Sequence, residues 1–71
     1  MESQLELKRE INVQIGHLQV AYMIEQVIKL LKEKSKEQVI KMINNAIDNF
    51  AGNYFYFKMS LLDVRDILSK N

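Results

Sequence analysis

Residues 4–34, QLELKREINVQIGHLQVAYMIEQVIKLLKEK, contain no proline and carry apolar residues at helical spacing, which predicts one continuous helix. At about 100° per residue, the apolar positions fall into two sets on roughly opposite sides. The first set, the N-terminal stripe, is Leu7, Ile11, Ile15, Leu18 and Tyr22. The second set is Val13, Val20, Ile24, Val27, Ile28 and Leu31. Because one small core cannot easily bury both sets, one of them is expected to pack on something else.

The predicted long helix is longer than the diameter of a compact domain of this size. A helix of about 30 residues is about 45 Å long, whereas a compact chain of 71 residues has a diameter of roughly 28 Å. A second helix running back along its C-terminal half would leave the N-terminal stripe uncovered. We therefore expect a homodimer with the N-terminal stripe as its interface. The alternative is a break at Gly16 and His17, which would give four short helices in a monomeric bundle.

Three serines divide the chain, since each stands three residues before an acid or amide, as in a capping box. These pairs are Ser3 with Glu6, Ser35 with Gln38, and Ser60 with Asp63. They predict helices at about 4–34, 36–51 and 61–70, and Gly52 suits the C-terminal end of the second. The expected fold class is all-α: a single domain over 1–71, a three-helix module with one long N-terminal helix, an antiparallel helix hairpin and a short C-terminal helix, in a dimeric helical bundle.

Four consecutive aromatic residues, Tyr54, Phe55, Tyr56 and Phe57, lie between the second and third predicted helices. Two conformations remain open for 53–59: a short strand, or a third helix that begins early, near Tyr54. Four successive side chains cannot all point into so small a core. Because tyrosine is enriched at interface hot spots, these four residues are the predicted partner-binding site. The competing interpretations are rings that close the end of the dimer core, and base stacking on single-stranded nucleic acid.

Composition excludes several classes of site. With no cysteine there is no disulfide, thiolate nucleophile or cysteine-bound zinc, and His17 is the single histidine. No cofactor or metal is therefore expected. The polar, acidic start does not resemble a signal peptide, and no apolar run is long enough to cross a bilayer, so we expect a cytoplasmic protein without a membrane partner.

Net charge is +1, which gives no global field toward nucleic acid. A local basic excess does occur around the predicted hairpin turn, at Lys29, Lys32, Lys34, Lys36 and Lys41, interrupted by Glu33 and Glu37. Phosphate contact by these lysines would indicate a small dimeric DNA-binding transcription regulator. Nucleic acid is thus a weakly supported partner, because the side chains that usually read bases are missing.

Catalysis has no recognisable residue set in this chain. His17, Asp48 and Asp66 are isolated positions, and paired carboxylates for acid–base work need a buried cleft. Surplus apolar surface is the stronger signal. The sequence therefore predicts a non-enzymatic regulatory or inhibitory module that dimerises and binds a larger protein partner, with DNA binding as the alternative.

Overall fold

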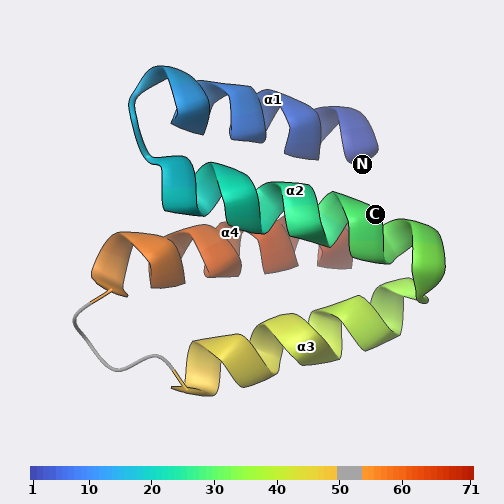
Figure 1. The fold of residues 1–71 in the computed structure, drawn as a ribbon. Coiled ribbons are helices and arrows are strands. Elements are labelled where there is room, and N and C mark those ends of the chain that lie inside the picture. Colours follow the sequence, from blue (N-terminus) through green and yellow to red (C-terminus); the bar gives the residue numbers. More distant parts are fainter. Residues whose placement is uncertain (50–53) are drawn as a thin grey trace.

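The computed structural model describes residues 1–49 and 54–71, and all regular structure in these ranges is helical (Figure 1). The helices are α1 (Glu2–Gln14), α2 (Leu18–Glu33), α3 (Lys36–Asn49) and α4 (Phe55–Lys70). The predicted all-α class is confirmed, and the predicted count of three helices is wrong. None of the helices in the described ranges has the length and apolar character needed to cross a membrane.

The predicted long helix is interrupted at Gly16, whose φ of 84° lies in the left-handed region. Backbone N–H groups of Gly16 and His17 donate to the carbonyl oxygens of Val13 and Asn12, at 3.1 and 2.8 Å. The chain reverses there, so α1 lies antiparallel beside α2 (Figure 1). Prediction of one helix over 4–34 is therefore wrong, and the alternative, a break at Gly16 and His17, is correct. Folding back buries Leu5, which an extended helix would carry away from the core.

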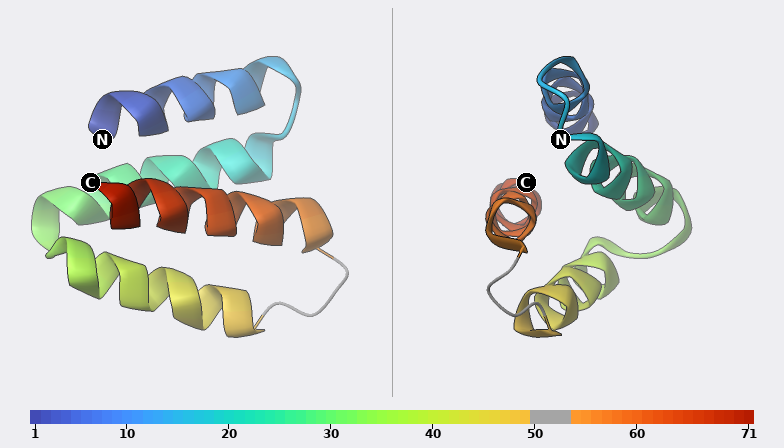
Figure 2. Two further views of the ribbon diagram at one scale, coloured as in Figure 1. Left: turned by 180° about the vertical axis from the view of Figure 1, so that it is seen from behind. Right: turned by 60° about the vertical axis from the view of Figure 1, so that its left-hand side comes forward.

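Helix α4 packs against both α2 and α3, and its C-terminal end lies near α1 (Figure 2). The helices α2 and α3 are joined by the short turn at Lys34 and Ser35, and Figure 1 shows that they diverge from this turn toward the end where α4 begins. Their antiparallel hairpin is thus open at one end.

The core draws unequally on the four helices. It comprises Leu5, Val20, Met23, Ile24, Val27, Ile28, Val39, Ile43, Ile47, Leu61, Val64 and Leu68. Helix α2 supplies the largest share, and α1 supplies Leu5 alone. Polar contacts at the surface add to the attachment of α1, including Lys8 Nζ to Asp63 Oδ2 at 3.2 Å and Asn71 Nδ2 to Gln4 Oε1 at 3.3 Å. Exposed pairs of this kind contribute little, so Leu5 is the main anchor of α1.

Capping follows the prediction at one of the three serines. The Ser35 N–H donates to Gln38 Oε1 at 3.1 Å, and the Gln38 N–H donates to Ser35 Oγ at 3.2 Å, which confirms the capping box of α3. Ser3 lies inside α1, and Ser60 lies inside α4, where its hydroxyl donates to the Tyr56 carbonyl oxygen at 2.9 Å. Both of those capping predictions are wrong.

Of the two conformations considered for the aromatic segment, the described residues 54–59 do not form the strand. Helix α4 begins at Phe55, six residues before the predicted start at 61, as the early-start alternative had it. The predicted helix end at 51 and the role of Gly52 lie outside the described residues.

We predict that Gly16→Ala lowers the free energy of unfolding by about 1–2 kcal/mol, since an L-residue at this φ crowds its own backbone. An added Cβ would meet no heavy atom within 4 Å, so the backbone conformation is the whole cause. Gly16→Asn is the control, because asparagine tolerates the left-handed region and should lose less. Urea denaturation measures both. Equal stability of Gly16→Ala and wild type would contradict the observed turn.

Ser35→Ala should cost about 1 kcal/mol of stability, because the N–H of Gln38 loses its acceptor at the start of α3. Ser69→Ala, an exposed position in the last turn of α4, is the matched control and should change stability by no more than about 0.5 kcal/mol. Thermal unfolding followed by circular dichroism compares the two. The same loss in both variants would argue against the capping box.

Candidate functional site: an apolar groove between α2 and α3

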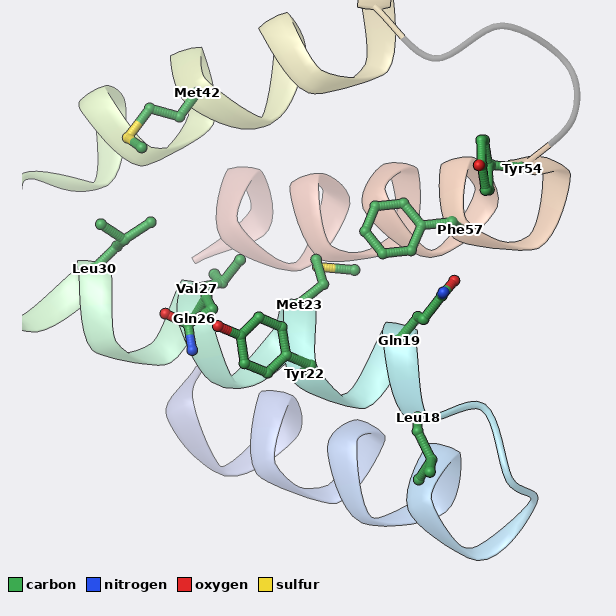
Figure 3. Close-up of a pocket in the computed structure, with 10 residues that line it drawn as sticks. All are labelled: Leu18, Gln19, Tyr22, Met23, Gln26, Val27, Leu30, Met42, Tyr54 and Phe57. Atoms are coloured by element: carbon green, nitrogen blue, oxygen red, sulfur yellow. The ribbon is translucent and has the colours of Figure 1, made fainter.

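An open groove of about 810 Å³ lies where α2 and α3 diverge (Figure 3). We call it the α2–α3 groove. Its lining residues are Leu18, Gln19, Tyr22, Met23, Gln26, Val27 and Leu30 of α2, Met42 of α3, and Tyr54 and Phe57 at the start of α4. From Leu18 to Leu30 the groove follows α2 for about 18 Å, or three turns of helix.

The groove exists because α2 is apolar on more sides than its neighbours cover. Val20, Ile24 and Ile28 lie on one side of α2 and are buried. Leu18 and Tyr22 are one turn apart on roughly the opposite side, where they are 63% and 65% exposed. A helix with apolar residues on opposite sides is ordinarily buried all round. Burial of the exposed side of α2 by another molecule would therefore be favourable.

No charged residue from 1–49 or 54–71 lines the α2–α3 groove. The amides of Gln19 and Gln26 and the hydroxyls of Tyr22 and Tyr54 are its polar side-chain groups. Met23 and Met42 add flexible, polarisable side chains that adapt to irregular apolar partners. Such a lining suits apolar side chains, and it offers no cation or carboxylate to fix a phosphate, an acid or an amine.

The four aromatic residues form a second feature, which we call the aromatic end. Tyr54, Phe55 and Tyr56 are exposed, while Phe57 is half-buried and packs against the core. The ring centroids of Phe55 and Tyr56 are 5.7 Å apart in an edge-to-face arrangement. The Tyr56 centroid is also 6.0 Å from that of His17. The aromatic end therefore adjoins the chain reversal at Gly16.

A smaller hollow of about 400 Å³ connects the aromatic end with the groove. All four aromatic residues line it, together with Gly16, His17, Leu18, Gln19 and Val20. Leu18, Gln19, Tyr54 and Phe57 line both hollows. Leu18 and Tyr22 of the N-terminal stripe thus meet the four aromatic residues on one continuous apolar surface.

The N-terminal stripe does not form one face. All five of its residues are exposed, but the reversal places Leu7 and Ile11 on α1, and Leu18 and Tyr22 on α2. Next to Leu18 and Tyr22, the α1 residues bordering the surface are Arg9, Glu10, Val13 and Gln14. Ile11 lies about 160° from Val13 around the axis of α1. Only the Leu18 and Tyr22 half of the stripe therefore borders the α2–α3 groove.

The remaining candidate residues are dispersed. Within residues 1–49 and 54–71, no three histidine or acidic side chains gather closely enough to hold a metal ion. Lys29, Lys34 and Lys41 are exposed near the turn between α2 and α3, while the Lys32 Nζ lies 3.9 Å from Glu2 Oε1. The basic excess is thus partly paired, and its use for DNA remains a prediction.

We predict that Tyr22→Ser leaves the free energy of unfolding of the dilute protein within about 0.5 kcal/mol of wild type, because the ring is largely exposed. Leu5→Ala is the contrasting variant: Leu5 is fully buried, and its truncation should cost about 2–5 kcal/mol. Urea denaturation at low protein concentration compares the two. A large loss in Tyr22→Ser would place Tyr22 in the core instead of on the groove.

The chain matches no protein-family model, no curated protein and no solved structure.

Proposed function

We propose that the chain is a non-enzymatic interaction module, which self-associates and binds a larger protein partner whose activity it regulates or inhibits. The observation that carries this proposal is the continuous apolar surface of the α2–α3 groove and the aromatic end. Contiguous exposed apolar surface with polar residues at its edge is a common feature of protein interaction sites.

The aromatic end is the proposed contact with the larger partner. Phe55 and Tyr56 are 60% and 72% exposed, and their rings already contact each other. Rigid aromatic side chains bury a large area at low entropic cost, which is why they recur as binding hot spots. Phe57, anchored on the core, fixes the start of α4 beneath them. The α2–α3 groove remains available to a second apolar contact.

The proposal predicts that Phe55→Ser/Tyr56→Ser strongly weakens partner binding while leaving the fold intact. The tagged wild-type chain is cross-linked in its native cells, the captured protein is purified, and its binding is then measured with the purified components. We expect the double variant to bind at least about 30-fold more weakly, as when a hot-spot residue is lost. The activity of the captured protein should fall when the wild-type chain is added.

The matched control is Leu7→Ser/Ile11→Ser, which removes two apolar side chains of similar exposure from α1. It should bind the partner like wild type. Equal binding by wild type and Phe55→Ser/Tyr56→Ser would contradict the proposed contact. Salt-sensitive binding to duplex DNA that Lys32→Ala/Lys36→Ala/Lys41→Ala abolishes would instead favour the DNA-binding regulator.

A further inference from the structure

We infer that the α2–α3 groove is filled by a second copy of this chain, with Leu18 and Tyr22 of each copy inserted into the groove of the other. This inference rests on the self-association in the proposed function and deepens it, because it assigns both the surface and its occupant. The two copies would be related by a twofold axis beside α2, with their α2 helices antiparallel.

The first support is that the projection and the recess are neighbours on one helix. Leu18 and Tyr22 stand at the rim of the groove and are among its most exposed residues, while Met23 and Val27 form its buried floor. With a twofold axis beside this rim, the rim of one copy lies against the groove of the other. The rim of each copy then fills the groove of the other, which is the self-complementarity that a twofold interface requires.

The second support is electrostatic. In a twofold interface, groups near the axis face their own counterparts, so a charged lining would repel itself. Among the described residues the groove lining carries no charge, and Arg9, Glu10 and Glu25 on the other side of the rim carry charges of both signs, so a second copy meets no field of a single sign there. The amides of Gln19 and Gln26 stand along the same wall as Tyr22 and offer hydrogen-bond partners for an incoming tyrosine hydroxyl. An acidic or basic peptide would find no counter-charge there.

The third support is area. The molecule measures 29 × 26 × 19 Å, so its broad side has an area similar to the roughly 800 Å² that each partner buries in a standard interface. A copy docked on the groove would therefore have to cover most of that side, including parts of α2, α3 and the start of α4. Exposed Leu18, Tyr22 and Met42 would supply the apolar centre of that interface.

The test is sedimentation equilibrium of the full chain from low to tens of micromolar concentration. Wild type should associate to a dimer. Tyr22→Asp and Met42→Lys, which put a charge on the rim and on the opposite wall, should each weaken the dimer by about 30-fold or more. Ile11→Asp is the control, since Ile11 is comparably exposed but lies on α1 away from the groove. Circular dichroism checks that every variant is folded.

Cross-linking then identifies the docking directly. The chain lacks cysteine, so single cysteines can be introduced cleanly. A mixture of Tyr22→Cys and Met42→Cys chains should form cross-linked heterodimers with a short bis-maleimide. A mixture of Ile11→Cys and Met42→Cys chains should form far fewer.

Two results would overturn the inference. One is a wild-type chain that stays monomeric, and the other is a dimer that Ile11→Asp disrupts while Tyr22→Asp and Met42→Lys do not. The second result would leave the proposed self-association standing and move it to α1. Conversely, a groove-dependent dimer whose aromatic end binds no partner would support the inference and contradict the proposed regulatory function.

Discussion

Helix α2 carries apolar side chains on more sides than the rest of the chain can cover, and the other features of the structure follow from this excess. Val20, Ile24 and Ile28 are buried on one side, while Leu18 and Tyr22 remain in solvent on the other. Hydrophobic burial is the dominant favourable term in folding. Helices α1, α3 and α4 each contact α2, and the side of α2 that they leave uncovered lines the α2–α3 groove.

The turn at Gly16 decides which side of α2 is covered from within the chain. Its left-handed backbone lets α1 fold back and bring Leu5 into the core. Periodicity in the sequence places the apolar residues of 4–34 on two sides of one helix, and this two-sided pattern holds only within α2. It does not reveal the break, because glycine costs only about 1 kcal/mol inside a helix and no proline or capping residue marks the position. Tertiary burial of Leu5 favours the reversal.

Prediction from sequence is most accurate for an amphipathic helix that buries a single apolar side in the core. In α3 the buried residues Val39, Ile43 and Ile47 recur at helical spacing on one side, and the predicted capping box of Ser35 is present. The pairing of Ser60 with Asp63 predicts that the last helix begins at residue 61. It begins at Phe55 instead, close to the alternative start near Tyr54. For the site, the sequence singled out Leu18, Tyr22 and the four aromatic residues. It missed Met42, because that residue lines the groove only through the position of α3 beside α2.

The central claim is that the α2–α3 groove is covered by a second copy in solution, and methionine oxidation tests it most directly. Met42 of the groove and Met59 on the outer side of α4 are 43% and 46% exposed, so they start from nearly equal accessibility. Brief oxidation followed by mass spectrometry is carried out across a range of protein concentrations. The account predicts that Met42 becomes protected as concentration rises while Met59 stays reactive. Equal oxidation of the two residues at every concentration would contradict it.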